Sequence, residues 1–138
     1  MPRKAPTKPQ LKKKAQTLLQ RLVRMKASDP NGYVQCVSCG VQKHYKQMDG
    51  GHFISRSFTF HTLREENIHP QCKMCNRYFG KVHDDYRRYM VDMYGEDYVE
   101  WLTDTKHRIT KLTTADLRDK ISELQTQIKE QERRLGEA

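Results

Sequence analysis

Apolar residues recur every three or four positions in four stretches of the chain, which is the spacing of an amphipathic helix. These stretches are residues 11–27, a stretch from Cys75 to Gly95, residues 96–106 and a stretch from Thr113 to about Leu135. Thr113 followed three residues later by Asp116 is typical of a capping box. The pattern therefore predicts four helices, of which the last is long and begins at Thr113.

The segment between the first two helices has a different pattern. The turn residues of 29–32, Asp-Pro-Asn-Gly, end the first helix. Short strands are predicted at Tyr33–Gln35 and over about Tyr45–Ile54, and residues 55–66 lack periodicity and are predicted as a loop. Residues 1–10 contain three prolines and are expected to form a flexible basic arm. The predicted fold class is α+β, a small β unit embedded among helices.

Composition limits the kind of protein that this fold can be. The chain has 138 residues, of which 36% are hydrophobic and 31% charged, and its mean hydropathy is −0.96. A core that encloses a large organic cofactor is therefore not expected. No apolar run approaches the roughly 20 residues that span a bilayer, and no apolar segment follows the basic N-terminus as in a secretory signal. We expect a soluble, cytoplasmic protein that is not bound to membranes.

Positive charge is concentrated at one end of the sequence. The net charge is +9, and residues 1–26 hold nine Lys or Arg and no Asp or Glu. Such a segment attracts nucleic acid by displacing counterions from phosphates. A solvated helix face is the alternative, and an anionic membrane is disfavoured because aromatic anchors are absent. The residues expected to bind DNA in this segment are Lys12, Lys13, Lys14 and Arg21.

All four cysteines occur in two Cys-x-x-Cys pairs, Cys36/Cys39 and Cys72/Cys75. Two intervening residues let one tight turn present both sulfurs to a single ion, and two such turns complete the tetrahedron that Zn²⁺ favours in structural sites. Disulfides, an iron–sulfur cluster and a redox pair are the alternatives. Disulfides do not suit an intracellular protein, and a redox site does not need two pairs. We expect one structural zinc.

The insert between the cysteine pairs contains candidate catalytic residues. His52 follows Asp49-Gly50-Gly51, Asn67 lies five residues before Cys72, and Asn76 directly follows Cys75. Each is ordinary alone, since a single His or Asn is usually structural. Together they resemble the signature of HNH, or His-Me finger, nucleases. This resemblance implies a zinc-stapled ββα-metal unit, which we expect within residues 11–112, followed by an amphipathic helix over residues 113–138.

The resemblance narrows to one family. Residues 49–56 (DGGHFISR), 61–64 (HTLR) and 67–72 (NIHPQC), with Cys75-Asn76, are similar to the phage NinG (Rap) recombination endonucleases. Membership would imply a metal-dependent endonuclease that hydrolyses branched DNA, such as D-loops and Holliday junctions, in the bacterial host of a phage.

Phosphodiester hydrolysis explains why these residue types are needed. A near-neutral imidazole can take a proton from water, so His52 is the expected general base. Carboxylate and amide oxygens suit Mg²⁺ or Mn²⁺, so Asp49 and Asn76 are the expected catalytic-metal ligands. Family analogy gives Asn67 a bracing role in the loop that orients His52. Arg56 and Arg64 are expected to contact phosphates.

Three questions remain open: the identity of the acidic metal ligand, the function and the oligomeric state. Many HNH sites have the acid directly before the histidine, where this chain has Gly51, so His83, Asp84 or His61 could replace Asp49 as ligand. The chain could instead be a non-catalytic zinc-ribbon DNA-binding or annealing protein, or an HNH endonuclease that reads sequence. The apolar stripe of residues 114–135 predicts a homodimer seam, although it could equally pack inside its own chain.

Overall fold

The structure is a computed structural model that describes residues 4–138, apart from the side chains of residues 79–82. The described chain is a mixed α+β protein with five helices and two small antiparallel sheets. The helices are α1 (Lys8–Ala27), α2 (Lys73–Arg77), α3 (Phe79–Tyr94), α4 (Glu96–Asp104) and α5 (Thr114–Arg134). The strands are β1 (Tyr33–Gln35), β2 (Gln42–His44), β3 (Asp49–His52) and β4 (Ile68–Gln71).

Helix α1 begins three residues earlier than expected and shortens the predicted arm. Thr7 caps it, since its hydroxyl accepts from Gln10 N and the Gln10 side chain accepts from Thr7 N at 2.9 Å. Pro9 lies in the first helical turn, where a missing N–H costs nothing. Residues 1–3 of the expected arm lie outside the described part of the chain.

The predicted long strand over Tyr45–Ile54 is wrong in its extent. A 3₁₀ turn at Tyr45–Gln47 occupies the start of the predicted range, and only β3 lies within it. Strand β2 precedes the turn and was not predicted. Strand β1 pairs with β2, and β3 pairs with β4, which the sequence did not predict. Every residue of β4 is buried, so polar His69 and Gln71 are enclosed together with Ile68 and Pro70.

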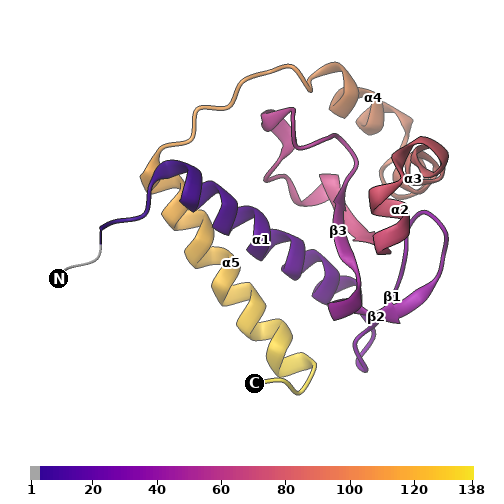
Figure 1. Ribbon diagram of the computed structural model, residues 1–138, viewed down its shortest axis with the longest axis horizontal. Coiled ribbons are helices and arrows are strands. Elements are labelled where there is room, and N and C mark those ends of the chain that lie inside the picture. Colours follow the sequence, from indigo (N-terminus) through magenta and orange to yellow (C-terminus); the bar gives the residue numbers. More distant parts are fainter. Residues whose placement is uncertain (1–3) are drawn as a thin grey trace.

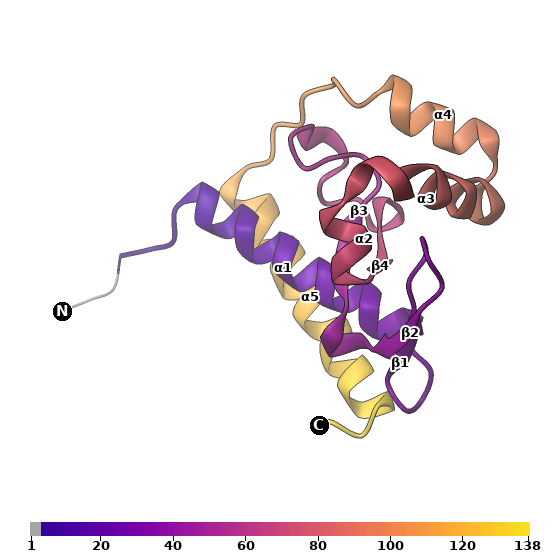
Figure 2. The same ribbon diagram turned by 45° about the vertical axis from the view of Figure 1, so that its right-hand side comes forward.

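Helices α1 and α5 pack side by side and run in the same direction (Figures 1 and 2). Leu11 and Ala15 near the start of α1 meet Leu117 and Ile121 near the start of α5. Further along, Leu124 and Ile128 join the main core with the second half of α1. The apolar stripe of α5 is therefore covered by its own chain. A homodimer stays a prediction and would need another surface.

The rest of the chain connects these two parallel helices. Strands β3 and β4 pack against α1, and α3 and α4 form a second core with Phe53 and Ile54 from the loop after β3. Residues 105–113 then return from α4 to the start of α5 (Figure 1). Among the described residues, no helix is both long and apolar enough to cross a membrane.

Candidate functional site

The four cysteines lie together at the base of the β unit. Their sulfurs are all within 4.8 Å of one another, and the Sγ atoms of Cys39 and Cys72 are 3.8 Å apart. Four sulfurs bound tetrahedrally at about 2.3 Å from one ion lie about 3.8 Å apart. None is in a disulfide. The donor set and spacing are consistent with one structural Zn²⁺.

The cysteine cluster also determines where helix α2 begins. Cys72 is the N-cap of this helix, and its sulfur accepts from Cys75 N at 3.4 Å. Burial alone raises the pKa of Cys36, but hydrogen bonds from backbone groups around Cys39 and Cys72 outweigh burial and lower it. Such N–H donors favour the thiolate form that zinc binds. Asn76 follows directly in α2, so the cluster fixes its position.

An open cleft of about 970 Å³ lies beside this cluster. Both ends of β3 contribute to it, through Asp49 and His52, and α2 contributes Asn76. The structure thus brings together the expected base and the two expected metal ligands, although 27 residues separate the first from the last in sequence.

His52 is held in one orientation by a backbone carbonyl. Its Nε2 lies 3.2 Å from Thr62 O. A carbonyl oxygen can only accept, so Nε2 carries the proton and Nδ1 has a free lone pair. Burial, followed by the positive charge of Arg56, lowers the pKa of His52 to about 4 against the raising effect of the Thr62 carbonyl. The imidazole is neutral at pH 7.

Asn67 connects the two segments that surround His52. It is fully buried, and its Oδ1 accepts from Ile54 N at 2.7 Å. Its Nδ2 donates to Ile54 O at 3.1 Å and to His61 O at 3.3 Å. The amide therefore joins the chain just after His52 to the turn that carries Thr62.

Asp49 and Asn76 lie side by side in the cleft lining. Asn76 Nδ2 donates to Asp49 Oδ2 at 3.0 Å, and Lys73 Nζ lies 3.2 Å from Asp49 Oδ1. Burial raises the pKa of Asp49, but these two contacts outweigh it and the net pKa is lowered. The carboxylate is ionised at neutral pH. Rotating the Asn76 amide by half a turn presents its oxygen to the same point, so the pair fits a hard divalent cation.

An acidic residue at position 51 would not fit this backbone. A Cβ at Gly51 would lie 1.8 Å from Gln71 Oε1, on the paired strand β4. Gln71 is buried and donates to Ser38 Oγ at 2.9 Å, so it is not free to move aside. A residue with a side chain directly before His52 would therefore require Gln71 to give up its present position.

The three residues that could replace Asp49 as a metal ligand lie in different places. His83 lines the cleft, with its ring 5.2 Å from that of Phe53. His61 is fully buried, and its Nε2 lies 2.9 Å from Thr105 Oγ1 and 3.1 Å from Leu102 O. Asp84 is exposed and is not part of the cleft lining.

The expected DNA-binding residues are divided between the cleft and other surfaces. Arg56 lines the cleft and is exposed. Arg64 instead donates to His61 Nδ1 at 3.0 Å and lies 4.8 Å from the centre of the Trp101 ring. Lys13 and Lys14 are exposed on α1 and Lys12 is partly buried, while Arg21 lies 3.9 Å from Glu132.

Three further cationic residues line the cleft and were not expected there: Arg24, Arg77 and Lys106. Arg24 Nη1 donates to Met48 O at 2.8 Å and to Tyr45 O at 3.2 Å, so it fixes the chain just before Asp49. Arg77 adjoins the motif residue Asn76 and could have been found from that position. Lys106 reaches the cleft from the end of α4, which no local signal indicates.

A buried network of Tyr86, Tyr94 and His69 packs against β3, and the sequence analysis assigned no role to His69. Tyr86 Oη donates to Gly51 O at 2.7 Å, so His69 Nδ1, 3.2 Å away, must be the donor to that hydroxyl. His69 Nε2 then accepts from Tyr94 Oη at 2.8 Å. Burial lowers the pKa of His69 to about 4, consistent with a neutral structural role.

These observations define a small α+β protein in which a four-cysteine cluster adjoins a cationic cleft that contains His, Asp and Asn side chains. The family model described as bacteriophage lambda NinG protein matches residues 2–134. The chain therefore belongs to the NinG family. Comparisons with curated proteins and with solved structures give no match.

Proposed function

We propose that the protein is a divalent-metal-dependent endonuclease that hydrolyses phosphodiester bonds in branched DNA, with β3, β4 and α2 as an HNH-type ββα-metal unit. The observation that carries the proposal is the meeting of Asp49, His52 and Asn76 in one open cleft with a cationic lining. The choice of D-loops and Holliday junctions as substrates is supported by the family resemblance, with the bacterial host cytoplasm as the place of action.

His52 would act as the general base. The Thr62 carbonyl holds the Nε2 proton, so the lone pair of Nδ1 is the one available to accept a proton from the attacking water. Since the imidazole is neutral at pH 7, it is ready for this step without first losing a proton. Asn67 keeps the carbonyl of Thr62 in place through His61 and so acts on the base indirectly.

Asp49 and Asn76 would hold Mg²⁺ or Mn²⁺, which supplies Lewis-acid stabilisation of the phosphoryl and departing oxygens. Lys73 and Arg24 keep Asp49 ionised and in place. Arg56, Arg77 and Lys106 would contact the phosphates on either side of the cut, since guanidinium and ammonium groups attract phosphate oxygens.

The competing proposal is a zinc-ribbon protein that binds DNA without cutting it. Binding alone needs the basic residues and the cysteine cluster. It does not need an imidazole with one nitrogen anchored and the other free, within a cleft that also holds a carboxylate and an amide. This constellation favours the enzyme.

The test incubates purified protein with end-labelled linear, forked, D-loop and four-way DNA, in Mg²⁺ or Mn²⁺. We expect cleavage of the branched substrates, and its loss in His52→Ala with DNA affinity near wild type, because the base acts in the transition state. His107→Ala is the matched control, since His107 is exposed and outside the cleft lining. Undiminished cutting by His52→Ala would refute the assignment.

A further inference from the structure

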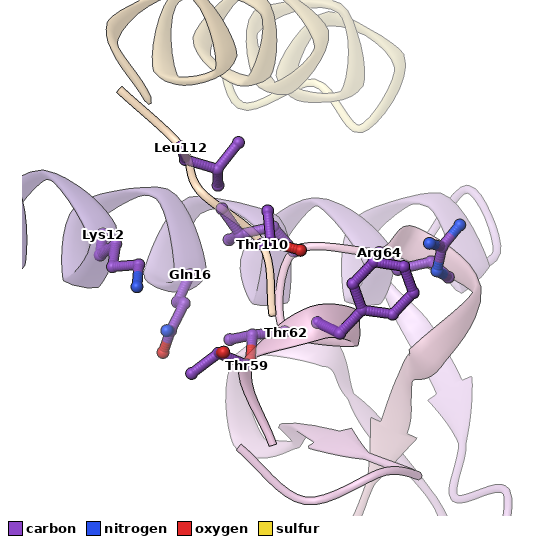
Figure 3. A pocket seen from close by; sticks show the side chains of 9 residues that line it. Lys12, Gln16, Thr59, Thr62, Arg64, Thr110 and Leu112 are labelled. Atoms are coloured by element: carbon purple, nitrogen blue, oxygen red, sulfur yellow. The ribbon is translucent and has the colours of Figure 1, made fainter. Parts of the chain in front are cut away.

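A second, smaller pocket of about 270 Å³ lies next to the cleft. The first half of α1 provides one wall, the turn of residues 59–64 a second and the segment before α5 a third (Figure 3). Its lining combines apolar side chains with polar groups. The residues are Lys12, Gln16, Thr59, Phe60, Thr62, Leu63, Arg64, Thr110 and Leu112.

One ridge of α1 connects this pocket to the cleft. Lys12 and Gln16 line the pocket, and Gln20 and Arg24 line the cleft. These four residues are spaced by four, so they form a single row on one face of the helix. The midpoint of the pocket pair and the midpoint of the cleft pair are eight residues apart, which is about 12 Å along the axis of α1.

Thr62 provides a second connection between the two sites. Its carbonyl accepts from His52 in the cleft, while the residue also lines the pocket. The turn that carries Thr62 is therefore a shared wall. Figure 3 shows Thr59 and Thr62 together on this wall, across from Leu112.

We propose that this pocket receives one unstacked nucleobase of the DNA strand that is bound in the cleft, an inference that rests on the proposed function. A strand advances by about 3.4 Å per nucleotide when stacked and by more when extended. A separation of about 12 Å then places the base two to four nucleotides from the cut phosphate.

The lining suits a base better than it suits a phosphate alone. Phe60, Leu63 and Leu112 offer an aromatic and aliphatic surface, and Gln16, Thr59 and Thr110 offer hydrogen-bonding groups for base edges. Lys12 supplies a positive charge for the adjoining phosphate. The volume of about 270 Å³ lies near the lower end of the range for small-molecule pockets, which is compatible with a ligand as small as a single base.

This occupant gives the site a physical reason to prefer branched DNA. A base can enter the pocket only after leaving the helical stack, which costs least where pairing is already interrupted. Branch points and single-stranded arms supply such bases, whereas linear duplex does not. The pocket would therefore determine substrate specificity without contacting the cut phosphate.

The experiment moves a single abasic position along the cut strand of a forked substrate and measures kcat/KM. In the wild type we expect a loss of about tenfold at one position two to four nucleotides from the cut, because base stacking on aromatic side chains is removed there. Thr59→Phe fills the pocket from an exposed position. In this variant the positional loss should disappear, so the two changes are not additive.

Thr17→Phe is the matched control, the same substitution at an exposed α1 position outside both linings, and it should retain the positional loss. A second readout needs no cleavage. With His52→Ala and no divalent metal, 2-aminopurine at the sensitive position should change its emission on binding, and should not do so when Thr59→Phe is added.

The outcomes separate the two proposals. If the DNA is cut but no abasic position is sensitive, the pocket proposal is wrong and the nuclease proposal stands. The same holds if Thr59→Phe leaves the positional loss unchanged. A position-specific fluorescence change without cleavage of any DNA keeps the pocket and overturns the nuclease. Absence of DNA binding overturns both.

Discussion

Replacing Asn67 with Ala tests the link between the fold and the proposed base. The change removes one acceptor and two donor contacts from a fully buried site, and it leaves Ile54 N, Ile54 O and His61 O without their partner. A hydrogen bond contributes about 1 kcal/mol net, and a buried donor left unsatisfied costs about 1–3 kcal/mol. We expect a loss of about 3–4 kcal/mol in the free energy of unfolding.

For a chain of this length such a loss lowers Tm by about 10–15 °C. Thermal unfolding by circular dichroism at constant zinc measures it, and Asn31→Ala is the control because Asn31 is an exposed turn residue. Because the Thr62 turn is released, kcat on a forked substrate should also fall. This holds even when kcat is measured well below 25 °C, where the variant is still folded.

Asn67→Asp separates the two kinds of contact. Its carboxylate retains the acceptor for Ile54 N but places negative charge against Ile54 O and His61 O, so protonation is favoured in the folded state. The stability of Asn67→Asp relative to the wild type should then be greatest at low pH and fall as the pH rises. A Tm for Asn67→Ala within 2 °C of the wild type would refute the bracing role.

Three further predictions concern the metal, the base and the basic helix. Purified protein should contain one zinc per chain, and Cys72→Ser should lose it and largely unfold the β unit; elemental analysis showing no zinc in the wild type would contradict this. The acid limb of kcat/KM should lie nearer pH 4 than pH 6.5, because the lowered pKa keeps His52 unprotonated down to that range, and a limb at 6.5 would show the burial to be unimportant. Changing Lys12, Lys13 and Lys14 to Gln together should reduce the slope of log K against log salt by about three, and an unchanged slope would show that they do not contact DNA.

Substituting the three lysines tests the contact with DNA more directly than truncating the chain does. Removing residues 1–14 would delete six positive charges, but it would also delete the Thr7 cap and the buried Leu11. A weaker salt dependence could then come from an unfolded α1. Neutralising exposed and half-exposed side chains changes the charge and leaves the helix in place.

Periodicity predicted the longer helices because each has one apolar face, but it did not separate α2 from α3, which end and begin on either side of Tyr78. The strands were harder, since β4 is buried on both sides and contains Pro70, which ordinarily argues against a paired strand. Tyr45 and Met48 are apolar and buried, as residues of a strand would be, although a 3₁₀ turn separates β2 from β3. Local sequence does not record which neighbours bury a residue.

Some residues of the candidate site could be predicted from the sequence and others could not. Motif spacing located His52, Asn76 and the cysteines, because short loops fix those distances. Lys106 lies just after α4, and the packing of α4 in the second core brings it to the cleft. A phosphate contact of Arg64 stays a prediction. Its guanidinium lies against His61 and Trp101, a placement that tertiary structure alone determines.

Asp49 and His52 lie at opposite ends of the same strand, β3, but different parts of the molecule hold them in place. Asp49 at the start of β3 is held by Asn76 and Lys73 of α2, the helix that Cys72 begins. His52 at its end is held by the Thr62 turn, which Asn67 fixes. Loosening α2 near the cysteine cluster should therefore weaken divalent-metal binding first and raise the Mg²⁺ concentration needed for cleavage. Loosening the Asn67 contacts should instead lower kcat at saturating Mg²⁺, because the proposed base is then misplaced while the proposed metal ligands stay in position.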